Sequence, residues 1–122
     1  MKHTIARFLP SPSQGMTPSE FTARDAFTTA DKTELNHFFY ASEDQNTLAG
    51  VWQCAPCRED FDAYPVNEMM TILSGSVTLT NKADNTTQTF TSGDSFFIAK
   101  GTPCVWEITE TLRKYYFIAT EG

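Results

Sequence analysis

Two residues could carry chemistry because their types are unusual for their places in the sequence. Glu68 begins an apolar segment, and alternation along a strand would put it on one face with Met70 and Ile72. A carboxylate buried on such a face must be paired, protonated or bound to a metal ion, whereas at the entry of a strand it is half solvated. Cys104 is one of three cysteines and directly follows a turn that contains a glycine. A buried site would therefore be sought around these two positions.

The elements that must position these residues are strands. Short runs rich in Val, Ile, Thr and aromatic residues follow one another from residue 36 onward, and turn residues separate them. Strands of about 5 to 6 residues at spacings of about 8 to 12 residues are typical of an all-β sandwich or barrel. Because no segment of helical periodicity alternates with these strands, a parallel α/β sheet is excluded. We therefore predict an all-β domain over residues 36–122.

Residues 1–35 differ from the rest of the chain in composition. Three of the six prolines fall within residues 1–18, and residues 19–35 have only weak helical periodicity. We expect an N-terminal arm that is irregular or contains a short helix. Such an arm would either cover the mouth of a barrel or swap onto a partner chain.

The overall composition limits the possible partners. A chain of 122 residues with 40% hydrophobic residues can bury one core. Its net charge is −6, from 15 acidic and 9 basic residues, so nucleic acid and anionic membranes are poor partners. The N-terminus has no apolar signal-peptide region and no apolar run approaches the ~20 residues of a membrane-spanning helix. We expect a cytoplasmic protein with reduced thiols.

Two spaced motifs resemble the two sequence signatures of cupins. The first signature usually reads His-x-His, three or four residues, Glu, six residues and Gly, and here Glu68 and Gly75 have that spacing. The second usually reads Gly, five residues, Pro-x-Gly, two residues and His, and here Gly93, Gly101 and Cys104 take the corresponding places. With the segments GVW and RKYY, the chain resembles a small single-domain cupin, more narrowly those related to (S)-ureidoglycine aminohydrolase.

The resemblance covers roughly residues 47–119 and implies a fold and an assembly. The fold would be the RmlC-like cupin jelly-roll β-barrel, also called a double-stranded β-helix. Met69 and Leu73 would lie on the outer face of the Glu68 strand, and we expect Val77 to lie there too. Because small cupins commonly bury such an apolar face between two copies, the resemblance implies a homodimer.

The resemblance also places the positions where metal-binding cupins have histidines. With three residues before Glu68, the two positions of the first signature fall on Asp62 and Tyr64, and with four they fall on residues 61 and 63. We favour the first register, since Tyr64-Pro65 resembles the His-Pro often found there. Cys104 takes the place of the last histidine, and the chain's two histidines lie far from both motifs. We therefore expect no cofactor, and the activity of the aminohydrolase branch does not carry over.

We predict a small-molecule site without a metal inside the barrel. Its polar groups and apolar walls would be Asp62, Tyr64, Glu68, Met70, Cys104, Trp106, Trp52 and Tyr116. The ligand would be a small polar or amine-bearing metabolite, because Glu68 can pair with an amine and the Trp faces favour a cation. Whether the protein is an enzyme stays open.

Three alternatives stay open at this point. Glu68, Asp62 and Cys104 could serve as substitute ligands for Zn²⁺, Mn²⁺ or Fe²⁺ in a hydrolase, isomerase or lyase. Lys114 could be an exposed strand lysine, or it could be the counter-ion of Glu68 in a purely structural network. The C-x-x-C pair at residues 54–57 follows a predicted strand rather than opening a helix, so we interpret it as structural instead of redox-active.

Overall fold

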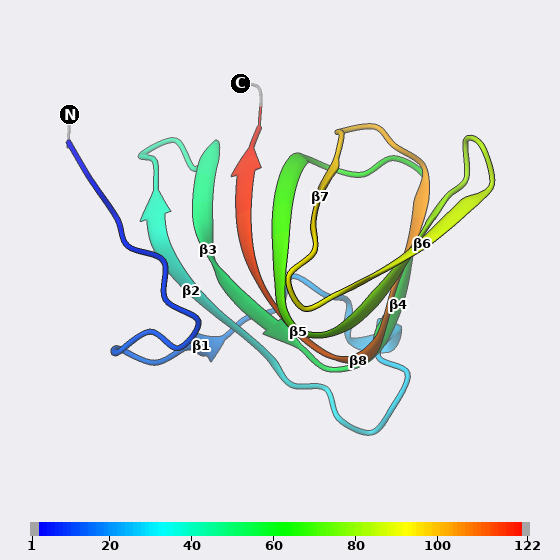
Figure 1. The fold of residues 1–122 in the computed structure, drawn as a ribbon, viewed down its shortest axis with the longest axis horizontal. Helices are drawn as coiled ribbons and strands as arrows, with labels where there is room; N and C mark the ends of the chain where they lie inside the picture. The colour runs from blue at the N-terminus through cyan, green and yellow to red at the C-terminus, as the bar shows by residue number, and fades with distance from the viewer. Residues whose placement is uncertain (1–2, 121–122) are drawn as a thin grey trace.

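The computed structural model describes residues 3–120, which form a curved sheet of eight strands that curls into a barrel (Figure 1). The elements are β1 (Thr17–Pro18), the 3-10 turn η1 (Arg24–Ala26), β2 (Glu34–Ala41), β3 (Thr47–Cys54), β4 (Cys57–Phe61), β5 (Asn67–Asn81), β6 (Thr86–Thr91), β7 (Ser95–Ile98) and β8 (Cys104–Ala119). The prediction of an all-β domain is confirmed. Within this part of the chain, no helix is long and apolar enough to cross a membrane.

The long strands β5 and β8 are the spine of the barrel. They pair with each other in antiparallel register over most of their length. The C-terminal half of β8 also pairs with β3 and its N-terminal half with β4, while β5 pairs first with β7 and then with β6. Because each long strand is shared between two groups of neighbours, its inward side chains all point into one interior.

A bulge at Gly75 bends β5. The register with β8 shifts between Ile72 and Val77, and Gly75 has a φ of +85°. A Cβ atom on Gly75 would lie 2.1 Å from the carbonyl oxygen of Thr111, so only glycine permits this approach of the two strands.

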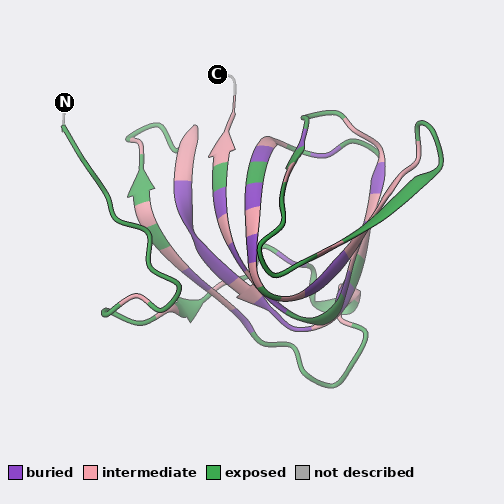
Figure 2. Ribbon diagram, viewed as in Figure 1, coloured by how far each residue is buried: buried purple, intermediate pink, exposed green. Residues whose placement is uncertain are grey.

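The bulge also reverses which residues of β5 face inward. Glu68, Met70 and Ile72 are buried before it, as alternation predicted, and Figure 2 shows buried positions alternating with less buried ones along this part of β5. Alternation also placed Val77 on the outer face, and this was wrong, because Val77 is completely buried. The extra residues of the bulge shift the period-two pattern by one position.

The outer face of the sheet carries a row of exposed apolar side chains. Met69 on β5 lies directly opposite Phe97 on β7 and Phe117 on β8. These side chains are 48%, 60% and 46% exposed, respectively. The row is therefore contiguous across three neighbouring strands.

The N-terminal arm runs along the sheet. Its strand β1 pairs with the start of β2, and η1 contacts β4. Near the start of the arm, the Phe8 ring stacks on Phe39 at 4.9 Å and meets Tyr115 edge-on at 5.3 Å. Phe21 and Thr22, between β1 and η1, reach the mouth of the barrel.

Candidate ligand-binding site

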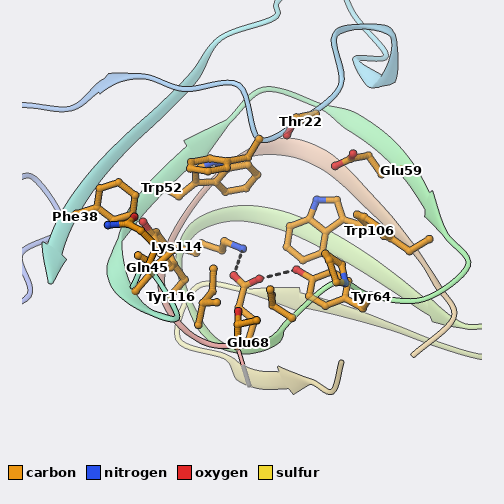
Figure 3. Close-up of a pocket in the computed structure, with 17 residues that line it drawn as sticks. Thr22, Phe38, Gln45, Trp52, Glu59, Tyr64, Glu68, Trp106, Lys114 and Tyr116 are labelled. Atoms are coloured by element: carbon orange, nitrogen blue, oxygen red, sulfur yellow. Dashed lines mark hydrogen bonds and ion pairs between the residues drawn. The ribbon is translucent and has the colours of Figure 1, made fainter. Parts of the chain in front are cut away.

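A cavity of about 390 Å³ opens at the mouth of the barrel (Figure 3). Its lining comes from the arm, from β2, β3, β4, β5 and β8, and from two loops, and consists of Phe21, Thr22, Phe38, Gln45, Leu48, Trp52, Glu59, Phe61, Tyr64, Pro65, Val66, Glu68, Trp106, Lys114, Tyr116, Ile118 and Thr120. Most of these side chains are apolar or aromatic. A concave apolar wall with a few polar groups is the usual form of a small-molecule site.

The carboxylate of Glu68 lies on one wall of this cavity, with both oxygens engaged. The ammonium of Lys114 donates to Oε2 at 2.8 Å, and the hydroxyl of Tyr64 donates to Oε1 at 2.6 Å. The Glu68 and Lys114 side chains are each only 6% exposed. Burial, followed by the nearby Glu68 charge, raises the pKa of Tyr64 well above its usual range, so its hydroxyl stays a donor. The buried carboxylate is therefore paired within the protein.

Lys114 also occupies the place between two indole rings. Its Nζ lies 4.7 Å from the ring centroid of Trp52 and 4.6 Å from that of Trp106, and 3.0 Å from Sδ of Met70. The two rings meet at 60° with their centroids 6.3 Å apart (Figure 3). An aromatic face attracts a cation, and here that cation is the protein's own. The π faces that we assigned to a ligand's cation thus already hold Lys114.

Trp52 is fixed from behind by a second buried carboxylate. Oε2 of Glu34 accepts from the indole Nε1 at 3.1 Å and from the backbone N–H of Phe21 at 2.9 Å, while Oε1 accepts from the N–H of Thr22 at 2.8 Å. Ser19 donates to the same group. Burial alone would raise the pKa of Glu34, but these hydrogen bonds outweigh it and hold the pKa below its usual value. Glu34 thus ties the arm to one wall of the cavity.

Glu59 is a lining residue that the sequence analysis missed. It lies on β4 directly opposite Trp106 on β8, and its carboxylate is at the rim of the cavity (Figure 3). Burial is the main cause that raises the pKa of Glu59. The alternation of Cys57, Glu59 and Phe61 along β4 was a signal that could have found it, because the other two residues face inward.

The sequence of the chain identifies its family. A profile of the EutQ-like cupin domain matches residues 41–116, more than half of the chain. This chain belongs to the EutQ-like cupin family. The cupin part of the predicted resemblance is therefore confirmed, together with the jelly-roll barrel fold.

Several solved structures share the cupin fold. One is a DUF861-family protein of unknown function from Pseudomonas syringae pv. tomato, with 24% identity over 85% of this chain and a TM-score of 0.75. The present chain covers only 44% of that protein's length. A putative ethanolamine utilization protein from Salmonella typhimurium has 18% identity, covers 74% of this chain and 72% of its own, and gives a TM-score of 0.60. The EutQ protein of Clostridium difficile has 16% identity, with coverages of 85% and 80% and a TM-score of 0.60. Among curated proteins, none matches this cupin.

The structure brings together five of the eight site residues predicted for this cupin. Trp52, Tyr64, Glu68, Trp106 and Tyr116 all line the cavity. The Tyr116 hydroxyl donates to Oδ1 of Asn36 at 2.6 Å, and burial raises the Tyr116 pKa. Met70 lies behind this lining, completely buried, where it contacts the Lys114 ammonium.

Asp62 and Cys104 lie elsewhere. We placed Asp62 in the barrel interior, and the structure corrects this: its side chain is fully exposed and lies 4.0 Å from Nζ of Lys82. The reason is that β4 ends at Phe61, so strand alternation no longer applies at Asp62. Cys104 is buried on the inward face of β8, but it lines a separate hollow next to β6 and β7. Burial raises the pKa of the Cys104 thiol.

The residues present do not fit the metal site that cupins commonly have. Of the three substitute ligands considered above, Asp62 is at the surface, Cys104 lines another hollow, and Glu68 is paired with a lysine. Within residues 3–120, no three His, Cys, Asp or Glu side chains form a group that could hold a metal ion. The side chains that line this cavity therefore do not provide a ligand set for a metal ion.

The C-x-x-C pair is part of the core. Cys54 ends β3, Cys57 begins β4, and both are completely buried as free thiols. Cys54 donates a hydrogen bond to Cys57, which raises the pKa of Cys54 and lowers that of Cys57. The pair joins two strand ends, in line with the structural interpretation.

Proposed function

We propose that this cupin binds a small polar or amine-bearing organic molecule in the mouth of its barrel and does so without a histidine-based metal site. The observation that carries the proposal is the double engagement of Glu68, by Lys114 at 2.8 Å and by Tyr64 at 2.6 Å, beside an apolar cavity of about 390 Å³. In a metal-binding cupin the equivalent carboxylate serves an ion. Here a tethered ammonium supplies the positive charge.

This arrangement suits binding because the site needs no rearrangement to accept an organic group. The protein itself satisfies the deep polar atoms, so a ligand does not have to replace any lost hydrogen bond. The walls formed by Trp52, Trp106 and Tyr116 are held in place because both indoles contact Lys114 and each other and the Tyr116 hydroxyl donates to Asn36. A rigid aromatic wall loses little conformational freedom when a ligand binds, which favours affinity.

Three further features belong to the proposal. The cupin would act as a homodimer through the outer apolar row formed by Met69, Phe97 and Phe117, because a contiguous exposed apolar patch favours association. It would work in the cytoplasm with its thiols reduced. It would belong among the small cupins related to (S)-ureidoglycine aminohydrolase, without their histidine-dependent chemistry.

The proposal can be tested by thermal unfolding of the untagged protein against a panel of small amines, alcohols and carboxylates. A molecule that binds the native state raises the melting temperature in proportion to the logarithm of its concentration. We expect at least one class to do so, with the same shift in the presence of a chelator. The proposal fails if no organic molecule shifts the transition. It also fails if the purified protein holds about one equivalent of a transition metal and loses stability when a chelator removes it.

A further inference from the structure

Glu59 presents a carboxylate to the cavity that forms no close ion pair with a basic side chain of the described residues. Among the described residues that line the cavity, three are charged: Glu59, Glu68 and Lys114. Glu68 and Lys114 form a close ion pair and cancel each other. Within residues 3–120, Glu59 has no Lys, Arg or His nitrogen within 4.0 Å. The cavity therefore carries one net negative charge, located at Glu59.

The surroundings of Glu59 make this charge costly in the empty cavity. The residue lies beside the indole of Trp106, its partner across the β4–β8 register, and close to the apolar side chain of Phe61 on its own strand. Burial is the main cause that raises the Glu59 pKa, and the neighbouring Glu34 carboxylate adds to the shift, whereas a hydrogen bond from the backbone of Ala23 and the charge of Lys114 only partly offset it. A carboxylate in these surroundings gains most from a cation that arrives together with apolar surface.

Resting on the function proposed above, we infer that the ligand is a monocationic amine whose ammonium is held by Glu59 while its apolar body lies against Trp106 and the other aromatic walls. The deep pair of Glu68 and Lys114 stays intact, so it excludes a second cation from the bottom of the cavity instead of receiving the ligand. Glu59 is therefore a specificity-determining residue. It pairs with the amine of the ligand, which is the role that we predicted for Glu68 from the sequence.

A set of matched probes tests the inference by calorimetric titration. Phenethylamine carries the ammonium, phenethyl alcohol has nearly the same shape without a charge, and hydrocinnamate carries a negative charge. We expect the amine to bind at least about tenfold more tightly than the alcohol, as for one charge-assisted hydrogen bond, and the carboxylate to bind most weakly. In Glu59→Gln the preference for the amine over the alcohol should disappear, while Glu110→Gln, an exposed change on β8, should keep it.

The possible failures are distinguishable. If the alcohol binds as tightly as the amine to the wild type, or if Glu59→Gln keeps the amine preference, the inference is overturned and binding in the cavity stands. If none of the three probes nor any member of the wider panel binds, the proposed function itself is overturned. The Gln side chain has nearly the volume of Glu and no charge to bury, so a melting temperature equal to or above that of the wild type would establish that the variant is folded.

Discussion

The ammonium of Lys114 lies 2.8 Å from Oε2 of Glu68, and the two side chains come from β8 and β5, the strands that form the spine of the barrel. Bringing two charges out of water costs several kcal/mol per ion, and their mutual attraction only approximately offsets that cost. Here Tyr64 donates a further hydrogen bond to the carboxylate, and the faces of two indole rings lie against the ammonium. Each charge therefore depends on the other for its place in the barrel.

The first prediction concerns this dependence. Lys114→Met should destabilise the fold by about 3–5 kcal/mol, because it leaves the Glu68 carboxylate buried without a cation. The double variant with Glu68→Gln should recover a large part of that loss, since no unpaired charge remains. Urea unfolding of the wild type, both single variants and the double variant measures the interaction energy. Strictly additive losses would mean that the pair is not coupled.

The second prediction concerns the second buried carboxylate. Glu34→Gln should weaken stability by about 1–3 kcal/mol, because the amide cannot accept all the hydrogen bonds that the carboxylate takes from the arm and from Trp52. Hydrogen exchange should accelerate at the backbone amides of Phe21 and Thr22. An exposed change, Glu43→Gln, is the control. Unchanged exchange at those two amides would contradict the role of Glu34 in holding the arm.

The same carboxylate gives stability a defined pH dependence. The folded-state pKa of Glu34 lies below its ordinary value of 4.5. The stabilisation is therefore complete above pH 4.5 and is lost as the pH falls through the lower pKa of the folded state. The unfolded chain binds the proton at the higher pH, and the folded protein binds it only when the pH reaches its own lower pKa. The difference in unfolding free energy between the wild type and Glu34→Gln should shrink over that acid range.

The composition and spacing of the short runs were sufficient to find most of the strands but not β4, and period-two alternation found most of the inward faces. It correctly placed Glu68, Met70 and Trp106 inside, because regular strand geometry leaves no other choice. It failed at Val77, where the bulge at Gly75 shifts the pattern, and at Asp62, which lies just beyond the end of β4. A break in register depends on the partner strand, and the sequence of a single strand does not contain it.

Several residues of the candidate site were predictable from the sequence, but the contact between Glu68 and Lys114 was not. The sequence identified Glu68 as anomalous and offered Lys114 as one possible counter-ion, yet their contact depends on the β5–β8 register, which long-range pairing determines. Glu59 was missed because it stands between two charged residues, Arg58 and Asp60, in a segment that was not predicted to be a strand. In the structure those two side chains point away from the interior and Glu59 alone faces the cavity.

The third prediction tests the bulge. Gly75→Ala should be strongly destabilising, because a Cβ atom would lie 2.1 Å from the carbonyl oxygen of Thr111 and the backbone has a φ of +85°. Gly93→Ala is a matched control, since Gly93 has a similar φ of +93° but nothing within 4 Å of its would-be Cβ. The control should cost only about 1 kcal/mol, for the positive φ alone. Equal losses in chemical denaturation would mean that the contact with Thr111 is unimportant.

The fourth prediction concerns the outer apolar row. Met69→Lys should convert the proposed homodimer into monomers, because the charge would have to be buried at the centre of the row between Phe97 and Phe117. Sedimentation velocity measures the change in mass. Gln88→Lys, an exposed change on β6, adds the same charge away from the row and should leave the assembly intact. A wild type that sediments as a monomer at all concentrations would refute the dimer.

The last prediction links the Glu59 assignment to pH. The pKa of Glu59 is raised above its ordinary value of 4.5, mainly by burial, whereas an aliphatic amine stays protonated throughout the acid and neutral range. As the pH falls through the raised value, protons compete with the ammonium for the carboxylate, and the affinity for phenethylamine should fall. The other charged groups near Glu59 do not produce this pattern. Glu34 has a lowered pKa and titrates further into acid, and Lys114 is paired with Glu68. Affinity for the amine should therefore lose its pH dependence in Glu59→Gln, and a dependence that persists in that variant would place the ammonium elsewhere.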